Sequence, residues 1–209
     1  MSDPLAGIDR DRIGGAIVAG GESTRFGGQP KGLCSVGGVR IIDRVRQALE
    51  SVVYDVVLVA NAPDAESWLS GIRVLRDRGT ERGSLVGLRT AVAGAGHPVI
   101  VVAWDMPFVT SDLLSLLISS TRPGATAVIP DGPRGPEPMC ALYTPGCLSE
   151  IDSALERRDL RLSSLVSQLH DAVRLGTSDV SAVGDPSRLF FNVNTPADLV
   201  VAERMAREA

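Results

Sequence analysis

Short apolar runs alternate with amphipathic helical patterns along almost the whole chain, and this alternation limits the fold more than any other feature. Residues 55–61 and 98–105 are typical of strands, and residues 40–52 and 85–96 are typical of helices. Strands that alternate with helices form a mainly parallel sheet with helices on both faces. The run at 98–105, PVIVVAWD, is apolar enough for a strand buried on both faces. We therefore expect one domain over residues 1–209, with a Rossmann-like, three-layer α/β/α fold around a mainly parallel mixed sheet.

The composition excludes several classes of protein. The chain has 209 residues, 44% of them hydrophobic, and a formal net charge of −4, so it can form a large core but is no general binder of nucleic acid or membrane surfaces. The three cysteines form no CxxC pair and the two histidines are far apart, so we expect reduced structural thiols and no zinc site. No apolar run is long enough to span a membrane, and the first residues lack the core of a signal peptide. We expect a cytoplasmic enzyme that meets any anionic ligand with a local basic site.

The first predicted strand runs directly into a glycine-rich loop that carries two cations, AIVAGGESTRFGGQPK at 16–31. Glycine lets backbone N–H groups come close to a phosphate because it has no Cβ. Arg25 and Lys31 lie six residues apart in this loop and can hold one polyphosphate from two sides. The loop matches neither GxxxxGK[ST], since Pro30 precedes Lys31, nor GxGxxG. From the spacing alone, the alternatives are a phosphate-binding loop and a solvated loop whose charges keep the sheet edge soluble.

Two further segments place polar side chains where ligands are expected. Asp105 stands at the carboxyl end of the most apolar predicted strand, which is where open α/β sheets bind their ligands. A helix cap or a turn residue is the alternative. Asn192 and Asn194 stand two apart in a run, 188–195, that we predict to be a strand, so both side chains would point to one face. Asparagine is depleted in strands, and the alternative is a turn before the proline that follows.

Three strings, VAGGESTRFGGQPKG, DMPFV and NVNTP, resemble in this order the signature motifs of the molybdenum cofactor guanylyltransferase family. They resemble sugar-phosphate nucleotidyltransferases more loosely. The resemblance covers the chain from about residue 14 to residue 200 and implies a fold of the nucleotidyltransferase (nucleotide-diphospho-sugar transferase) type. It implies Arg25, Lys31 and Asp105 as catalytic residues, and Asp105 with Asn194 as ligands of Mg²⁺. The residues that it places on the nucleotide are Val18, Ala19, Gly20, Gly21, Arg25, Lys31, Asn61, Asp77 and Asp105.

The matches on the side of the nucleotide base are weaker. Asn61 and Asp77 end predicted strands where the family contacts its nucleotide, and an Asp77 carboxylate can accept hydrogen bonds from N1–H and N2–H₂ of guanine. A turn former and a loop charge are the alternatives for these two residues. The string GSLVGL departs from the family's G-P-L-A-G at Ser84 and Val86, which leaves the base specificity open.

On the acceptor side, GPEPMCALY at 135–143 resembles the strand that lines the acceptor pocket of the family. Cationic side chains in the string RRDLRLSSL could meet an acceptor phosphate or a pterin, and a solvated helix end is the alternative for each. The candidate acceptor-binding residues are Asn192, Arg157, Arg158 and Arg161.

The resemblance implies a Mg²⁺-dependent guanylyltransferase that transfers GMP from GTP to the phosphate of molybdopterin and releases pyrophosphate. A phosphate monoester is already a nucleophile at neutral pH, which fits a chain without a Ser-His-Asp arrangement. The alternatives are a related nucleotidyltransferase that uses CTP or another phosphorylated acceptor, and a nucleotide-binding regulator without turnover. Molybdenum cofactor delivery proteins are expected partners, whereas nucleic acid and membranes are not.

Overall fold

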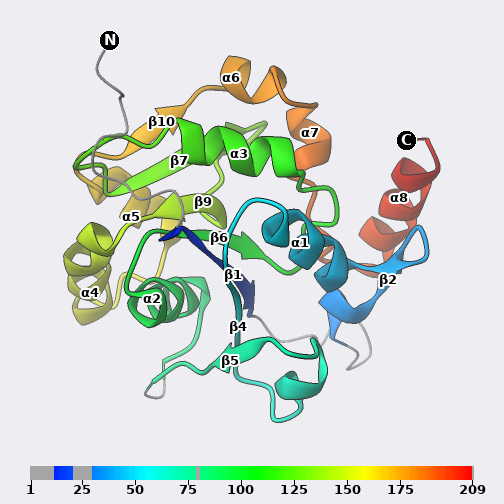
Figure 1. Cartoon of the computed structure of the whole chain (residues 1–209), viewed down its shortest axis with the longest axis horizontal. Coiled ribbons are helices and arrows are strands. Elements are labelled where there is room, and N and C mark those ends of the chain that lie inside the picture. The colour runs from blue at the N-terminus through cyan, green and yellow to red at the C-terminus, as the bar shows by residue number, and fades with distance from the viewer. Residues whose placement is uncertain (1–11, 21–29, 79–80, 209) are drawn as a thin grey trace.

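The structure is a computed structural model that describes residues 12–20, 30–78 and 81–208. Its main sheet has the strand order β10-β7-β9-β6-β1-β4-β5, with β8 paired to β7, and β2 and β3 form a separate hairpin (Figure 1). β6, β1, β4 and β5 are parallel neighbours, β10 is parallel to β7, and β9 runs antiparallel to both β6 and β7. This arrangement confirms the mainly parallel mixed sheet predicted from the sequence. The strands are β1 Gly14–Ala19, β2 Ser35–Val36, β3 Val39–Arg40, β4 Val56–Ala60, β5 Arg73–Leu75, β6 Val99–Ala103, β7 Ala127–Gly132, β8 Gly135–Pro136, β9 Cys140–Tyr143 and β10 Val173–Leu175.

The central strands are apolar on both faces. In and just before β1, Ile13 and Ile17 pack into one hydrophobic cluster, whereas Ala16 and Val18 pack into another. This is the alternation that a pleated strand imposes on successive side chains. All four side chains are at most 4% exposed, so the burial of apolar surface on both sides stabilises the centre of the sheet.

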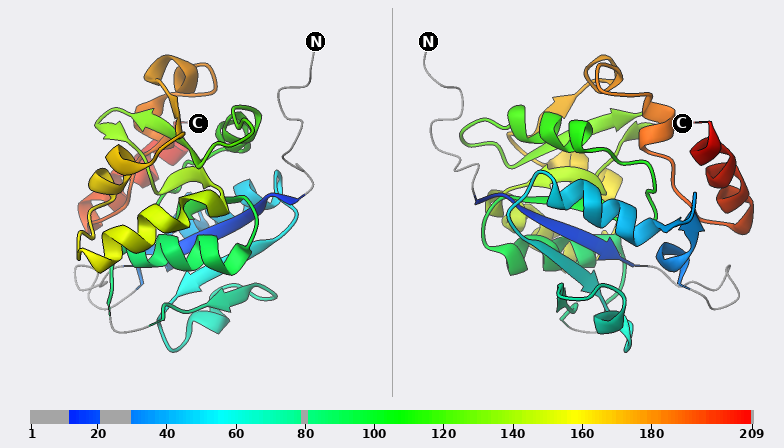
Figure 2. Two further views of the ribbon diagram at one scale, coloured as in Figure 1. Left: turned by 90° about the vertical axis from the view of Figure 1, so that its left-hand side faces the viewer. Right: turned by 45° about the vertical axis from the view of Figure 1, so that its right-hand side comes forward.

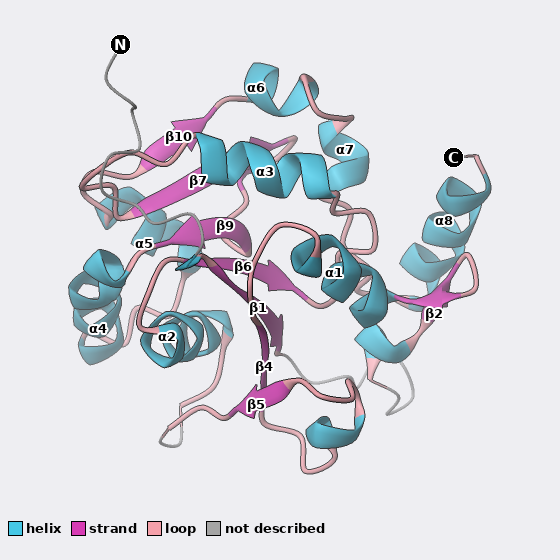
Figure 3. Ribbon diagram, in the orientation of Figure 1, coloured by secondary structure: helices cyan, strands magenta, loops and turns pink. Residues whose placement is uncertain are grey.

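Helices cover both faces of this sheet, as Figures 2 and 3 show. α1, α3, α6 and α7 pack into the cluster that contains Ile17, and α2, α4 and α5 pack into the cluster that contains Val18. The predicted three-layer α/β/α arrangement is therefore confirmed. The helices are α1 Ile41–Glu50, α2 Ser84–Ala95, α3 Ser111–Ser119, α4 Leu148–Glu156, α5 Leu162–Gln168, α6 Thr177–Ser181, α7 Pro186–Leu189 and α8 Pro196–Arg207.

A third hydrophobic cluster joins α8 to the β2–β3 hairpin, which lies beside it in Figure 1. Gly37 and Gly38 connect the two strands with φ angles of 59° and 78°, which a type I′ hairpin turn requires and glycine adopts without strain. The cluster includes Cys34, Val193 and Ala202. It therefore packs two segments together that are far apart in the sequence, the one after residue 31 and the one before residue 194.

The strand predicted at 188–195 is wrong. Asp185 caps the short helix α7 and Pro186 fits its first turn, so the chain forms a helix where a strand was expected to begin. Phe190 packs against one face of the main sheet, whereas Val193 packs into the cluster with α8. The apolar pattern thus reflects burial in two separate places and not pairing in a sheet.

The cysteines Cys34, Cys140 and Cys147 are buried and free, as predicted. Burial raises the pKa of each thiol, which keeps these side chains protonated as packing residues. Within the described ranges, no group of three or more His, Cys, Asp or Glu side chains could hold a metal ion. Nor does the described chain contain a helix with the length and apolar character needed to cross a membrane.

Candidate functional site

Lys31, Asp105 and Asn194 meet beyond the carboxyl end of β6. The ammonium group of Lys31 donates to Asp105 Oδ2 at 2.5 Å and to Asn194 Oδ1 at 2.8 Å. Each of the three motifs found in the sequence supplies one of these residues. We refer to the three side chains as the Lys31 cluster. The structure brings together the predicted phosphate-binding lysine and both predicted metal ligands.

Asp105 is held in place through the backbone of its turn. The N–H of Trp104 donates to the carbonyl oxygen of Val18 in β1 (3.2 Å), and the N–H of Val193 donates to the carbonyl oxygen of Asp105 (2.9 Å). The turn after β6 is therefore bonded to β1 on one side and to the segment before Asn194 on the other.

Asn194 is positioned by the N-terminal cap of α8. Thr195 Oγ1 accepts from the N–H of Asp198, and Asp198 Oδ2 accepts from the N–H of Thr195 and from the N–H of Asn194. This capping box satisfies backbone donors that a helix start leaves free. It fixes the backbone of Asn194 and leaves the side-chain oxygen for Lys31.

Lys31 begins a 3₁₀ turn, Lys31–Leu33, that lies against an indole ring. A Cβ at Gly32 would stand 2.4 Å from Trp104 Cε3, so only glycine fits this position without a shift of the ring. Trp104 stacks in turn on Trp68, with ring centroids 5.2 Å apart. The backbone of the Lys31 segment is therefore packed directly on the residue that precedes Asp105.

The electrostatics of the Lys31 cluster favour a cation beside Asp105. The Asp105 side chain is 9% exposed, and its Oδ1 is buried without a hydrogen-bond partner among the described residues. A buried charge is costly unless it is paired, and Lys31 provides one partner. The carboxylate of Asp105 and the amide oxygen of Asn194 are the kind of donors that Mg²⁺ prefers. The unpartnered Oδ1 shows that the residues present fit such an ion.

A second polar group, the Asp77 cluster of Asn61, Asp77 and Thr90, lies beyond β4 and β5. Asp77 Oδ2 accepts from Asn61 Nδ2 at 2.7 Å, and Asp77 Oδ1 accepts from Thr90 Oγ1 at 2.6 Å. The backbone N–H of Asp77 donates to Asn61 Oδ1 at 2.9 Å. Each oxygen of a carboxylate keeps a further lone pair, so Asp77 can still accept from a ligand while its orientation is fixed. The predicted pair Asn61 and Asp77 is thus brought together, and Thr90, a polar residue of α2 that the sequence did not single out, completes the cluster.

The other predicted nucleotide contacts surround the end of β1. Val18 is buried in the sheet, Ala19 ends the strand, and Gly20 follows with open space where a Cβ would stand. Gly21 and Arg25 lie outside the described residues, so the contacts predicted for them stay predictions.

Asn192 lies close to Asn194 although neither belongs to a strand. Asn192 Nδ2 donates to the carbonyl oxygen of Phe190 at 2.9 Å. Both asparagine side chains line one cavity. The predicted proximity is therefore found on an irregular segment, not on one face of a strand.

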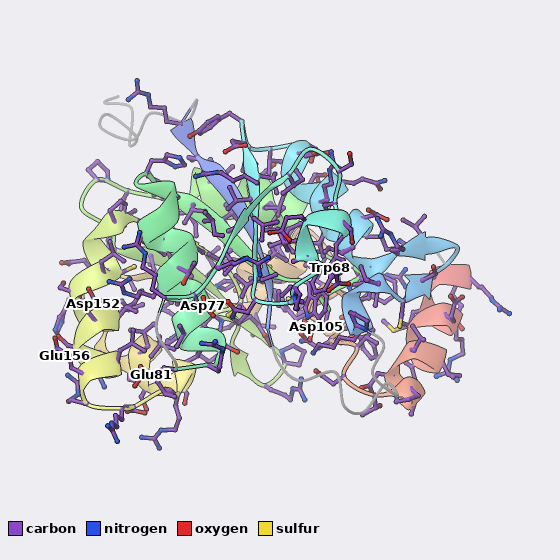
Figure 4. All side chains as sticks on the ribbon, turned by 90° about the horizontal axis from the view of Figure 1, so that it is seen from below. Trp68, Asp77, Glu81, Asp105, Asp152 and Glu156 are labelled. Carbon is purple, nitrogen blue, oxygen red and sulfur yellow. The ribbon has the colours of Figure 1, made fainter. Side chains whose placement is uncertain are left out.

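The three arginines predicted for the acceptor lie elsewhere, at the turn between α4 and α5. Arg157 donates to Gln168 Oε1 at 2.5 Å, Arg161 pairs with Asp159 at 2.9 Å, and Arg158 has a φ of 56°. Figure 4 shows α4, with Glu156 labelled, on the opposite side of the molecule from α8. The structure does not bring these arginines to the Lys31 cluster.

A cavity of about 480 Å³ opens on the other side of the Lys31 cluster from β4 and β5, and Asn194 belongs to its wall. We call it the Glu137 cavity. Its lining includes Arg134, Glu137, Phe190, Phe191, Asn192 and Asn194.

Glu137 is a second functional candidate, after Thr90, that the sequence did not single out. Burial raises the pKa of its carboxyl group to about 6, and the positive charge of Arg134 acts in the opposite direction. A Cβ at Gly132 would stand 2.5 Å from Glu137 Oε1, so the missing side chain of that glycine makes room for the carboxylate. The available signal was an acidic residue between Pro136 and Pro138, directly before the buried strand β9.

Comparison with known proteins connects these features to one family. The model of the family described as MobA-like NTP transferase domain matches residues 15–173. The molybdenum cofactor guanylyltransferase of Desulfosudis oleivorans is 34% identical over 196 residues, which cover 92% of this chain and 95% of that protein. The molybdenum cofactor guanylyltransferase of Cereibacter sphaeroides is 32% identical over 200 residues, which cover 94% of this chain and 98% of that protein.

Solved structures support the fold. The crystal structure of molybdopterin-guanine dinucleotide biosynthesis protein A from Archaeoglobus fulgidus has a TM-score of 0.80 at 24% identity, and the match covers 94% of this chain and 100% of that chain. The 4-diphosphocytidyl-2C-methyl-D-erythritol synthase of Anaerococcus prevotii has a TM-score of 0.70 at 14% identity, with 96% and 98% covered. The match to the family model over most of the sequence, together with relatives similar over almost their whole length, shows that the chain belongs to the MobA-like NTP transferase family.

Proposed function

We propose that the protein is a Mg²⁺-dependent guanylyltransferase that transfers GMP from GTP to the phosphate of molybdopterin. Relatives with 32–34% identity carry the name molybdenum cofactor guanylyltransferase and support this activity. The observation that carries the proposal is the Lys31 cluster, which joins one cation and two oxygen ligands beyond the carboxyl end of β6. Open α/β sheets bind their ligands at this edge.

The reaction joins two anions. An oxygen of the acceptor phosphate attacks the α-phosphorus of GTP, the bond between that phosphorus and the bridging oxygen breaks, and pyrophosphate leaves with the bond electrons. The second pKa of a phosphate monoester is about 6, so the nucleophile is ionised at neutral pH without a general base. The protein has to position the two substrates and to neutralise their charge.

The described residues divide these tasks. The Lys31 ammonium supplies positive charge to the triphosphate, and Asp105 with Asn194 would hold Mg²⁺. When bound, Mg²⁺ neutralises charge on the phosphate oxygens. The Asp77 cluster offers carboxylate lone pairs to the N–H groups of the guanine base. Arg25 is proposed to hold the phosphates together with Lys31, and a protein that delivers molybdopterin stays a predicted partner.

The test measures pyrophosphate release by the full chain with molybdopterin and Mg²⁺, while GTP and CTP compete as donors. We expect GTP to be preferred by at least about tenfold, since one good set of hydrogen bonds to a charged group is worth about 1.5–3 kcal/mol. Asp105→Asn should reduce kcat by about 10²- to 10³-fold, because it removes charge where the phosphates react.

The matched control is Asp171→Asn. Asp171 lies in a turn with a φ of 57°, a conformation that Asn also accepts readily, so turnover should be unchanged. Preference for CTP would assign the protein to cytidylyl transfer on the same fold. Nucleotide binding without pyrophosphate release from any donor would contradict an enzyme and favour a regulator.

A further inference from the structure

The Glu137 cavity is continuous with the place where the proposed reaction occurs. Asn194 lines the cavity and also accepts the hydrogen bond from Lys31. The backbone carbonyl of Met139 accepts from the N–H of Ala103 at the end of β6 (2.8 Å), so the segment before β9 lies beside the turn that carries Asp105. A molecule in this cavity can therefore present its phosphate to the Lys31 cluster while its other end lies deeper in the cavity.

The cavity has the size and the chemistry for a flat heterocycle. Its volume of about 480 Å³ lies in the range of pockets that enclose small organic ligands. Phe190 and Phe191 provide aromatic surface, and Asn192 provides an amide. Aromatic surface beside polar and charged side chains suits a ring system that is apolar on its faces and polar along its edges.

The Glu137 carboxylate stands in this wall as an acceptor of hydrogen bonds. No side chain that the structure describes donates a hydrogen bond to it, and the opposite charge that acts on it is Arg134. Its backbone is fixed, since the N–H of Glu137 donates to Pro130 O at 2.9 Å and Glu137 O accepts from the N–H of Cys140 at 3.0 Å. A half-buried carboxylate that lacks donors has a cost in stability, which a ligand with N–H groups removes.

Granted the pterin acceptor of the proposed function, we propose that Glu137 selects the acceptor by accepting hydrogen bonds from the paired N–H groups of its 2-amino-4-oxopyrimidine edge. This edge places two N–H donors side by side, and the two oxygens of one carboxylate match them. Gly132 makes room for the carboxylate, and the ring system lies between it and the Lys31 cluster. Glu137 is thus a specificity-determining residue for the acceptor and has no part in holding the triphosphate.

The experiment compares two fluorescent probes, pterin-6-ylmethyl phosphate and its N2,N2-dimethyl analogue, which lacks the N2–H donors. Their dissociation constants are measured by fluorescence with the full-length wild-type chain and with Glu137→Gln. We expect the wild type to bind the parent probe at least about tenfold more tightly than the analogue, since only the parent can donate from both N2 and N3 to the carboxylate. In Glu137→Gln the preference should fall to within twofold. Glu137→Asp retains the charge and should retain part of the preference.

The matched control is Glu156→Gln, on the exposed last residue of α4, which should keep the full preference. A second readout is turnover with molybdopterin, where Glu137→Gln should raise KM for the acceptor by tenfold or more with kcat within about twofold. A merely structural role for Glu137 would instead lower the stability of the chain and leave the ratio of the two probe affinities unchanged.

Absence of a preference in the wild type, absence of probe binding, or an unchanged preference in Glu137→Gln would each overturn the role of Glu137. A changed KM for GTP with an unchanged KM for the acceptor would also overturn it, because the carboxylate would then serve the nucleotide. Failure of the proposed function looks different: the wild type would release no pyrophosphate from GTP with molybdopterin, whatever the probes do.

Discussion

A carboxylate lies on each flank of the Lys31 cluster, and the two carboxylates differ in the hydrogen bonds that they accept. On the β4–β5 side, both oxygens of Asp77 accept hydrogen bonds from Asn61 and Thr90. On the β7–β9 side, the Glu137 carboxylate lacks such donors among the described residues, and its pKa is raised to about 6 by burial. The orientation of Asp77 is therefore fixed before a ligand binds, whereas the oxygens of Glu137 are open to hydrogen bonds from a ligand.

This difference indicates how one protein can distinguish two ligands whose hydrogen-bonding edges are similar. Guanine and a pterin both carry paired N–H donors, so donor chemistry alone does not separate them. At Asp77, fixed partners restrict the directions from which a ligand can approach. At Glu137, the aromatic walls and the desolvated carboxylate favour a ligand that fills the cavity and satisfies the charge.

The largest loss of turnover is expected from a change of Lys31, which lies between the two flanks and should affect the use of both substrates. Lys31→Met removes the cation between Asp105 and Asn194 and should reduce kcat by about 10³-fold, since preorganised charge is a major part of such catalysis. Lys31→Arg keeps the charge, but its planar fork differs from a compact ammonium, so a smaller loss is expected. The measurement is pyrophosphate release at saturating GTP and acceptor. Equal turnover in Lys31→Met and wild type would remove Lys31 from the mechanism.

An intermediate effect is expected from Asp77→Asn and should be confined to the nucleotide. The amide has one oxygen in place of two and no charge, so the ratio of kcat/KM for GTP over ATP should fall by about tenfold to hundredfold. KM for the acceptor should stay within twofold, and Asp171→Asn should leave both quantities unchanged. If the acceptor KM rises and the nucleotide preference stays, the assignment of the two flanks is reversed.

The smallest effect is expected on thermal stability, where Glu137→Gln should raise Tm at high pH. The pKa of Glu137 is raised from 4.5 to about 6 in the folded protein. The protonated carboxyl group is therefore favoured by folding, and its contribution to the free energy of unfolding is fully present below about pH 4.5 and is lost as the pH rises through 6. After a discount for solvent screening, the cost at pH 8 is about 1 kcal/mol. Glu137→Gln should remove it and raise Tm by about 2–4 °C at pH 8, with no gain at pH 4.

This shift is measured by thermal unfolding at the two pH values, with Glu156→Gln as the control that should show neither change. A lower Tm for Glu137→Gln at pH 8 would mean that the carboxylate supports the fold. That result would remove the contrast with Asp77.

The parallel direction of the central strands was predictable because the signals are local. Runs such as 98–105 are apolar on both faces, and amphipathic helices separate them. The same regularity placed Asp105 and Asp77 at the ends of parallel strands, where residues distant in sequence meet at one edge of the sheet.

The errors arose where burial comes from several directions at once. At 188–195 the alternation matched a strand, but Phe190 and Val193 are buried against different parts of the molecule. The cap at Asp185 and Pro186 was the local signal for the helix that forms there. A hydrophobic pattern states that residues are buried, not which surface buries them.

Side-chain contacts between segments that are distant in the sequence could not be predicted either. Thr90 is one of several polar residues on α2, and only the packing of that helix brings it to Asp77. Arg157 and Arg161 were proposed from their charge, but Gln168 and Asp159 lie close enough to engage them. The sequence did not single out Glu137 because its environment combines residues 132 and 134 of the β7–β8 hairpin with the distant segment around residue 190.

Lys31 is the only lysine in the sequence, and the other basic side chains are arginines and two histidines. Apart from the terminal amine, one ε-amino group is therefore available to acylating reagents, and it lies between Asp105 and Asn194 with 16% of its side chain exposed. The rate of its acylation, read by mass spectrometry as a single mass increment, reports on the occupancy of the site without any mutation. Protection by one nucleotide and not another would rank donors in a single labelling series, and a covalent inhibitor directed at amines would find one internal target in this protein.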